Sequence, residues 1–350
     1  MNRQISSFLL RLASVILALL FTSSVLLIAG ADPLDAFAHI ITGAISARGK
    51  IADVIVVWVP LIITTCGLVI SFAVGLWNIG IEGQITLGAI FTTAVLRILQ
   101  NSNLHPVLII ILGLLAGLAG GIFWALLAGV LKIFGGVNEI FAGLGLNFIA
   151  TAMTIWLIFG PWKRPGVASM SGTVPFDPAL RLPTFPDLRL SPWSVILAVT
   201  SIIFVYLFLR FTRAGMRIKA VGKNPRAASL MGIRSSSYLM LAFALCGLFA
   251  GLAGSLQVMA VYHRLIPSIS SGYGFLGLLV SMLVSHHPLW SAPVALLFAA
   301  FNIGGIQLPI EMKIDSTLSG VLQSGLVFFY LVMGGVREKL QKPQQDLSNE

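Results

Sequence analysis

Long apolar runs, separated by short polar segments, follow one another along almost the whole chain. A helix needs about 20 apolar residues to cross a membrane, and most of the runs reach that length. The pattern predicts an all-α fold, a polytopic membrane protein with about ten transmembrane helices in one domain over residues 1–350. The predicted spans are residues 8–29, 53–76, 79–99, 106–131, 139–160, 193–211, 238–262, 275–286, 289–306 and 316–333.

Four of these runs leave a choice. The second and third are separated only by Gly75–Gly80, without a charged residue, and the eighth is short enough to be tilted or broken. The first run precedes Ala29-Gly30-Ala31, which resembles a signal-peptidase site. That run is longer than the roughly 7–15 residues of a signal peptide's apolar region. We therefore expect residues 1–31 to be retained as an uncleaved first helix.

The composition indicates that lipid covers most of the surface. Hydrophobic residues make up 57% of the chain, charged residues make up only 10%, and the mean hydropathy is +0.96. A soluble domain carries about 25% charged residues. The net charge of +10 does not indicate nucleic-acid binding, because the basic residues are dispersed or lie in loops beside apolar runs. Cys66 and Cys246 lie inside apolar runs and predict no disulfide.

One segment between two apolar runs is strongly basic. Residues 210–234 hold seven Lys or Arg and no Asp or Glu, and the positive-inside rule places such a segment in the cytoplasm. With ten spans, both termini then lie in the cytoplasm. The same topology places residues 161–192 outside, as an ordered loop with turns, and the polar tail 337–350 inside.

The basic segment also carries the signals of a short helix. Asn224 is a favoured N-cap residue, Pro225 suits the first helical position, and Gly232 suits the position after the last turn. Ala227 and Ala228 give the helix a small surface. The loop 212–237 is therefore predicted to present a short cytoplasmic helix that fits a socket on another protein.

Two apolar runs carry small residues at every fourth position, from Gly113 to Gly121 and from Gly247 to Ser255. Lipid gives helices no hydrophobic reason to associate, so such stripes are needed where helices approach closely. We interpret both stripes as packing surfaces. Their likeness could also reflect an internal repeat of a transporter.

Polar residues interrupt the apolar pattern most strongly between Gly75 and Gln84. Glu82 is ionisable beside long apolar runs, which is costly in a bilayer and marks a functional-site hypothesis. Asn78 shares a helix face with Glu82 if the turn continues. Two interpretations stay open: a polar hinge on or near a transport pathway, or a carboxylate that caps or pairs at the membrane interface. The candidate pathway or hinge residues are Asn78, Gly80, Glu82, Gly83, Gln84 and Asn147.

The other polar residues in or near the runs favour structural roles. Asn138 and Glu139 fit an N-cap and an acidic first turn, and His286-His287 fit a turn at the membrane surface. The residues expected to form interhelical hydrogen bonds are Gln257, Asn302 and Gln307.

Several chemical signatures are missing from the sequence. It has no Gly-x-x-x-x-Gly-Lys-Ser/Thr phosphate loop, nucleophile elbow, zinc motif or Cys-x-x-Cys. We therefore expect no enzyme activity, no metal and no cofactor. No run carries the paired ionisable groups expected for proton coupling. An energy source would have to reside on another chain.

Three motifs, in order, resemble those of permease subunits of bacterial ATP-binding cassette importers for simple sugars and nucleosides. They are Leu76–Gln84, then Gly129–Ile140 with Leu146–Ala150, then Gly222–Ile233, and the resemblance extends over about residues 50–335. The second motif is most similar to the longer permease of the nucleoside-type branch. Asn147-Phe148 departs there from the usual Asn-Tyr.

The resemblance implies a permease subunit in the bacterial inner membrane that moves a nucleoside, or a simple sugar, into the cytoplasm. It implies a second and different permease chain, a separate ATPase subunit, and a substrate-binding protein outside; membrane lipid is a further partner. The alternative is an ion- or proton-coupled secondary transporter or channel. The positions that the resemblance assigns to ATPase coupling are Gly222, Asn224, Pro225, Ala227, Ala228 and Gly232.

Overall fold

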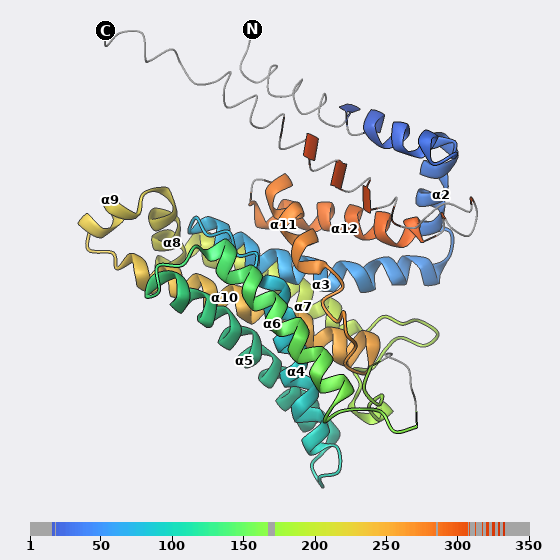
Figure 1. The fold of residues 1–350 in the computed structure, drawn as a ribbon, viewed down its shortest axis with the longest axis horizontal. Coiled ribbons are helices and arrows are strands. Elements are labelled where there is room, and N and C mark those ends of the chain that lie inside the picture. Colours follow the sequence, from blue (N-terminus) through green and yellow to red (C-terminus); the bar gives the residue numbers. More distant parts are fainter. Residues whose placement is uncertain are drawn as a thin grey trace. The chain divides into compact units, whose positions relative to one another are not determined.

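The computed structural model of the protein describes residues 16–17, 19–166, 172–284 and 286–306, and isolated positions between 308 and 332. These residues form helices joined by turns, with no β-strand among them (Figure 1). The predicted all-α class is confirmed. The helices are α2 (Pro33–Ile45), α3 (Arg48–Ala73), α4 (Ile81–Leu99), α5 (Pro106–Ile133), α6 (Glu139–Phe159), the 3-10 helix η1 (Pro178–Leu180), α7 (Pro192–Phe211), α8 (Arg213–Lys223), α9 (Pro225–Leu230), α10 (Ser235–Leu256), the π-helix η2 (Gln257–Tyr262), α11 (Tyr273–Leu283) and α12 (Pro288–Gly305).

Seven helices among the described residues are long and apolar enough to cross a membrane, which makes this a multi-pass membrane protein. They are α3, α4, α5, α6, α7, α10 with η2, and α12, and each matches a predicted run. The pair Leu19–Ile28 and Pro33–Ile45, bent by 106°, would be an eighth span if it is counted as one. The predicted count of about ten is not confirmed, because α11 has only 11 residues and residues 316–333 are described only at isolated positions.

Short polar side chains and prolines begin several helices, among them the predicted start at Asn138 and the helix α2, which was not predicted. The Asn138 side chain accepts a hydrogen bond from the Ile140 N–H at 2.8 Å, and Asp32 caps α2 in the same way at 2.8 Å. Each cap satisfies a backbone donor that has no partner inside the helix. Glu139, the first residue of α6, pairs with Lys132 at 2.5 Å.

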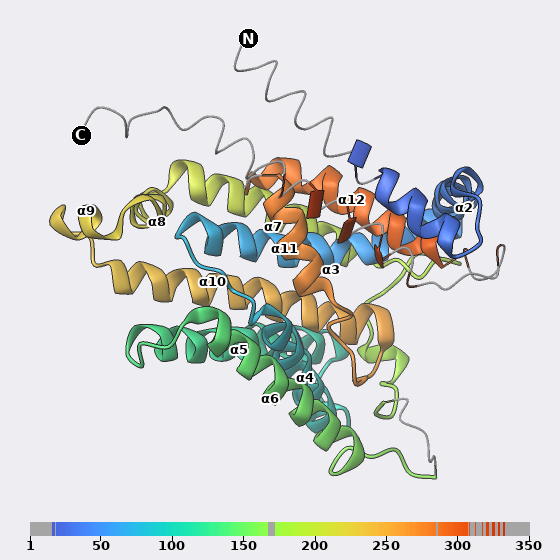
Figure 2. The ribbon, with the colours of Figure 1, turned by 45° about the horizontal axis from the view of Figure 1, so that its top comes forward.

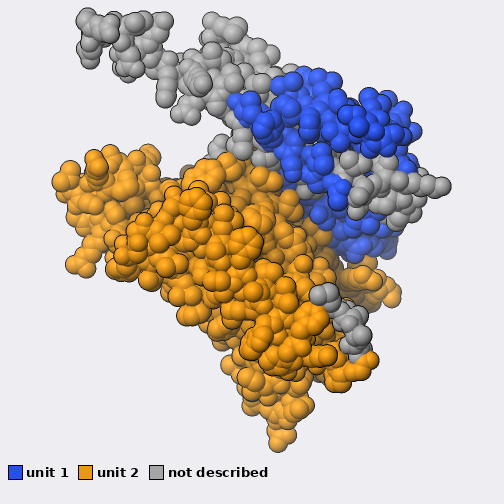
Figure 3. Space-filling view, in the orientation of Figure 1, with its two compact units in different colours: residues 1–54, 297–350 blue, residues 55–296 orange. Residues whose placement is uncertain are grey.

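The chain separates into two compact units, coloured differently in Figure 3. Unit 1 contains residues 1–54 and 297–350, and unit 2 contains residues 55–296. In unit 1, Ile40 and Leu308 are almost fully buried in a small apolar cluster, and a Cβ at Gly304 would lie 2.0 Å from the Ile40 carbonyl oxygen. The assignment of residues 1–350 to one permease domain stays a prediction.

The centre of unit 2 is a close packing of α4, α5 and α10, and Figure 2 shows α10 running alongside α5. A Cβ at Gly121 would lie 2.2 Å from the Gly247 carbonyl oxygen, and one at Gly251 would lie 2.2 Å from the Gly117 carbonyl oxygen. Real Cβ atoms do not approach so closely, so these backbones touch because the side chains are missing. The predicted role of both glycine stripes in packing is confirmed.

Candidate functional site

The chain breaks its helical path between α3 and α4, at the polar stretch that the sequence singles out. The Asn78 and Gln84 side-chain amides exchange two hydrogen bonds, at 3.1 and 3.0 Å, and both side chains are buried. Asn78 Nδ2 also lies 3.1 Å from the Cys246 sulfur of α10. The amide pair therefore fixes the start of α4 against α10.

Asn147 of α6 closes the same break from the other side. Its Oδ1 accepts a hydrogen bond from the Gly83 N–H at 2.8 Å, and its Nδ2 donates one to the Ile79 carbonyl at 2.9 Å. A Cβ at Gly80 would lie 2.9 Å from the Gly143 Cα. One side chain thus satisfies backbone groups that a continuous helix would have paired internally, and the glycines let α6 approach.

The Glu82 carboxylate contacts a different helix, α11. Its Oε1 accepts a hydrogen bond from the Phe275 N–H at 3.0 Å, and the Gly274 N–H and the Ser270 hydroxyl also interact with the carboxylate. Since α11 begins at Tyr273, the carboxylate lies at that helix's N-terminus, where unpaired N–H groups favour a negative charge. This contact is a capping contact, one of the two interpretations that the sequence left open.

The expected shared helix face of Asn78 and Glu82 is absent, because α4 begins only at Ile81. Asn78 points to α10, and Glu82 contacts the start of α11. The predicted candidates do gather around the first turn of α4, but they form two networks and not one.

The basic loop forms two helices, α8 and α9. Helix α8 was not predicted; its signal is Thr212, whose Oγ1 caps the helix by accepting a hydrogen bond from the Gly215 N–H at 3.0 Å. In α9, Asn224 Oδ1 accepts from the N–H groups of Arg226 and Ala227, at 3.0 Å each.

The end of α9 is closed as predicted. Gly232 has φ +78°, the left-handed conformation that glycine adopts readily, and the Ile233 N–H donates to the Ala228 carbonyl at 3.0 Å. Together with the N-cap and Pro225 at the first helical position, this confirms the predicted short helix in the loop 212–237.

Two of the predicted coupling residues face inward. Ala228 is only 3% exposed, and a Cβ at Gly222 would lie 2.2 Å from the Ala73 carbonyl oxygen at the end of α3. We expected both alanines of α9 to form a contact surface, but only Ala227 is exposed. Leu230 is 90% and Met231 80% exposed. These three residues give the loop an apolar outer face.

Residues 161–192, apart from 167–171, which lie outside the described part, form an ordered loop against the chain after η2. Thr173 pairs with Leu265 through two hydrogen bonds of 2.9 and 3.1 Å, and the Phe176 N–H donates to the His263 carbonyl at 2.8 Å. The Leu182 N–H donates to the Met259 carbonyl at 3.1 Å. The prediction of an ordered loop is confirmed for its described residues.

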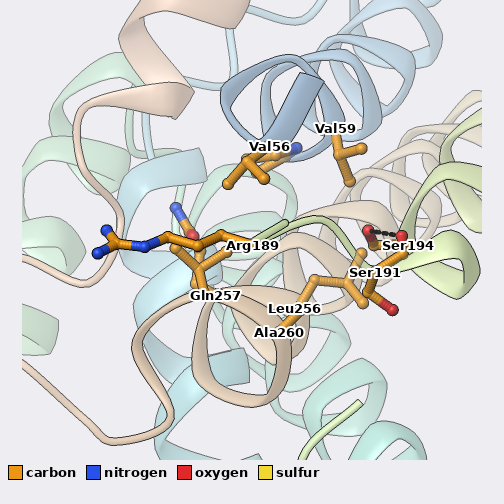
Figure 4. Close-up of a pocket in the computed structure, with 10 residues that line it drawn as sticks. Val56, Val59, Arg189, Ser191, Ser194, Leu256, Gln257 and Ala260 are labelled. Carbon is orange, nitrogen blue, oxygen red and sulfur yellow. Dashed lines mark hydrogen bonds between the residues drawn. The ribbon is translucent and has the colours of Figure 1, made fainter. Parts of the chain in front are cut away.

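The π-helix η2 begins with Gln257, whose side chain is buried. Gln257 was expected to form an interhelical hydrogen bond, and the Tyr273 hydroxyl of α11 lies near enough to interact with its amide, although neither amide atom has a partner in strict hydrogen-bond geometry. The Ser191 hydroxyl is likewise unpaired. Figure 4 shows Gln257, Ser191, Ser194 and Arg189 around a cavity of about 10 Å³, which holds roughly one water-sized group.

Within the described part of the chain, no three His, Cys, Asp or Glu side chains come together as a metal site requires. Buried polar groups tie helices together, and the basic loop projects an exposed helix.

Comparison with known proteins gives matches over nearly the whole chain. Glucose ABC transporter permease protein TsgB13 of Haloferax volcanii is 28% identical over 90% of this chain and 85% of its own length. Guanosine ABC transporter permease protein NupP of Bacillus subtilis is 23% identical, with 97% and 99% covered. Nucleoside ABC transporter permease protein NupB of Lactococcus lactis subsp. cremoris is 23% identical, with 100% and 98% covered.

Among solved structures, PsaBC from Streptococcus pneumoniae in complex with Fab matches 85% of this chain and 95% of its own, at 13% identity and a TM-score of 0.49, too low to support an inference. The family model described as "Branched-chain amino acid transport system / permease component" matches residues 50–333, which include all three sequence motifs and both networks around α4. The chain therefore belongs to this family of membrane permeases.

Proposed function

We propose that this protein is the permease subunit of an ATP-binding cassette importer that carries a nucleoside, or a simple sugar, into the cytoplasm. The observation that carries the proposal is the α8–α9 loop, a capped helix pair with an exposed apolar face at Ala227, Leu230 and Met231. Such a face needs a partner, and the relatives are named as permeases of ABC transporters. A separate ATPase subunit is the partner that this loop fits.

The other proposed partners follow from the same assignment. A second, different permease chain would complete the pore, a substrate-binding protein would deliver cargo from outside, and the assembly would lie in the bacterial inner membrane. Co-purification of the tagged protein with an ATPase chain and a second permease from its native membrane tests this. A protein that transports alone in vesicles without ATP would contradict the proposal.

The nucleoside assignment rests on the stretch 129–150 and on two relatives, NupP and NupB, which are named for guanosine and nucleoside. TsgB13, which is named for glucose, favours the alternative cargo, a simple sugar. The cognate binding protein should be purified and titrated with nucleosides, bases, pentoses and hexoses. We expect tight binding of a nucleoside; tight binding of a sugar alone would replace the cargo and leave the importer assignment in place.

The polar residues around α4 are proposed as a hinge beside the transport pathway. Asn78, Gln84 and Asn147 close a break in the backbone with side-chain hydrogen bonds, which can exchange without unfolding either helix. Gln257 is added as a candidate solute contact, because neither atom of its buried amide has a partner in strict hydrogen-bond geometry, and the amide could therefore bind a neutral polar group.

The proposed topology has ten spans and cytoplasmic termini. Thr184 in the loop 161–192 and Ser236 at the start of α10 are both exposed, and the native cysteines are buried, so introduced cysteines at 184 and 236 can be labelled with little background. We expect an impermeant reagent to label position 184 from outside and position 236 only after the membrane is opened. Labelling of both from outside would overturn this orientation.

A further inference from the structure

A basic cleft of about 320 Å³ lies in unit 2 where three apolar helices end or begin. Arg210 comes from the last turn of α7, Lys219 from α8, and His286 and His287 from the segment before α12. Leu209 and Pro288 add an apolar wall. The volume falls in the range of small-ligand sites, roughly 300–1,000 Å³.

We infer from the ends of the candidate spans that the cleft lies at the level of the lipid headgroups. Ala73, which also lines it, is the last residue of α3, and Pro288 is the first residue of α12. Since α3, α7 and α12 are all long and apolar enough to cross a membrane, their ends mark the boundary between hydrocarbon and water.

The cations of the cleft have no acidic partner among the residues that the structure describes. No carboxylate lines the cleft, and the salt bridge found among the described residues joins Lys132 to Glu139, not Arg210 or Lys219. Two unpaired cations beside an apolar wall suit a ligand with a phosphate at one end and hydrocarbon at the other.

Arg210 is already held in place for such a ligand. Its guanidinium carbon lies 5.5 Å from the centre of the Tyr206 ring and 5.4 Å from that of Phe211, and the Tyr206 hydroxyl accepts a hydrogen bond from it. Contacts with two rings restrict the long side chain before any ligand arrives. Less ordering is then needed when a phosphate binds.

The histidine segment is also fixed in shape. His286 has φ +62°, an uncommon conformation for a side-chain-bearing residue, and its ring stacks on Phe72 with 4.3 Å between ring centres. Its Nδ1 pairs with the Ser281 hydroxyl at 3.2 Å. We expected His286 and His287 to form a turn. The structure has a turn there, and it forms one edge of the cleft.

We propose that this cleft binds the headgroup of an anionic phospholipid, with the phosphate between Arg210 and Lys219 and the acyl chains along the wall that includes Leu209. Because Lys219 belongs to α8, which leads directly into α9, a bound lipid would hold the coupling loop at the membrane surface. A free phosphate shares the headgroup chemistry, and an acidic protein surface is the competing class of partner.

The test uses the full-length protein in nanodiscs of phosphatidylcholine, with and without phosphatidylglycerol. The cleft variant is Arg210→Gln with Lys219→Gln, and Lys219→Gln alone serves if the double variant folds poorly. The matched control is Arg226→Gln with Arg234→Gln, which removes the same charge from exposed positions of the same basic segment, outside the cleft. Retained phosphatidylglycerol is counted by native mass spectrometry, and thermal stability is measured in parallel.

We expect phosphatidylglycerol to stay bound to the wild type and the control and to raise their melting temperature. The cleft variant should bind it roughly tenfold more weakly or worse. An equal loss in the control would overturn the proposal, since it would show only general charge attraction. So would an equal stabilisation by inorganic phosphate, which would indicate a free-phosphate site. Unchanged lipid retention with lost ATPase association would assign the cations to a protein contact.

Discussion

The packed centre of unit 2 and the α8–α9 loop both depend on small residues, for opposite reasons. In the centre, Gly121 and Gly247 have no side chain, and so two helix backbones come into contact. In the loop, Ala227 leaves a short helix exposed beside Leu230, which is 90% exposed. Small residues in the first region let helices pack closely, whereas in the second they belong to an exposed surface that we propose as a partner contact.

The polar side chains of the region around α4 and of the α8–α9 loop also differ in whether they have partners within the chain. Around the first turn of α4, Asn78, Gln84 and Glu82 find their hydrogen-bond partners within the chain. In the loop, the basic side chains have no carboxylate partner among the described residues. The interior polar groups therefore bond within the chain, whereas the loop charges have no acidic partner among the described residues.

The largest expected effect is on the packed centre. Gly121→Leu should abolish folding, because even its Cβ would lie 2.2 Å from the Gly247 carbonyl oxygen and neither helix backbone can move aside easily. Overpacking costs of about 3 kcal/mol or more are expected. Yield of monodisperse protein in detergent and its melting temperature measure this.

Gly145→Leu is the matched control for that substitution. Gly145 lies on α6 with no heavy atom within 4 Å of a Cβ built on it, so we expect near-normal yield and melting temperature. Equal loss for both variants would mean that leucine is damaging for reasons other than helix contact, and the packing comparison would fail.

The next effect separates coupling from folding. Ala227→Glu places a charge on the exposed face of α9, where a surface substitution changes stability by about 0.5 kcal/mol or less. ATP-dependent uptake in vesicles should nevertheless fall at least about tenfold, since a buried unpaired carboxylate at an interface is costly.

Two controls bracket this result. Thr184→Glu adds the same charge at an exposed site of the loop 161–192 and should leave uptake unchanged. Ala228→Glu, at a 3% exposed position, should lower both the melting temperature and uptake, and so cannot test coupling alone. Normal uptake with Ala227→Glu would show that the outer face of α9 is not the ATPase contact.

A smaller effect is expected at Glu82. Glu82→Ala removes the acceptor for the Phe275 N–H at the start of α11, a loss of about 1–3 kcal/mol, and should impair transport. Glu139→Ala breaks a partly exposed ion pair, for which a loss of about 0–1 kcal/mol is typical.

Rates of uptake and melting temperatures of the two variants should be compared with those of Glu82→Gln, which keeps an acceptor without the charge. If Glu139→Ala is the more harmful substitution for uptake, then the weight given to the α4 network is misplaced.

The sequence predicted those features that depend on neighbouring residues. Apolar runs gave seven spanning helices, and caps such as Asn138 and Asn224 placed helix starts, because hydropathy and capping act over a few residues. The helix α8 was not predicted because its many basic residues are typical of a loop between two spans. Its apolar face is small, since only a few of its residues, such as Ile218 and Val221, are buried.

Partners distant in the chain could not be predicted. Glu82 accepts a hydrogen bond from Phe275, which lies 193 residues later in the chain. The residues next to Glu82 in the sequence do not indicate that partner. The inward direction of Ala228 depends on how α9 sits on the chain before and after it. Gln257 was expected to pair, because the pattern shows a polar residue in a helix but not the π-helix around it.

The smallest effect that we predict is at the N-cap of α9. Asn224 Oδ1 accepts from the N–H groups of both Arg226 and Ala227, and loss of such a cap costs about 1 kcal/mol. A helix of six residues has few other internal bonds, so Asn224→Ala should loosen α9 without affecting the packed centre. Amide hydrogen exchange should rise in residues 225–230 and stay unchanged in α5, with uptake reduced a few-fold. Asn224→Asp keeps an acceptor at the same position and should restore both measurements. Loosened α9 with full uptake would show that the loop does not need a preformed helix to couple, and the comparison with the rigid centre would be sharper still.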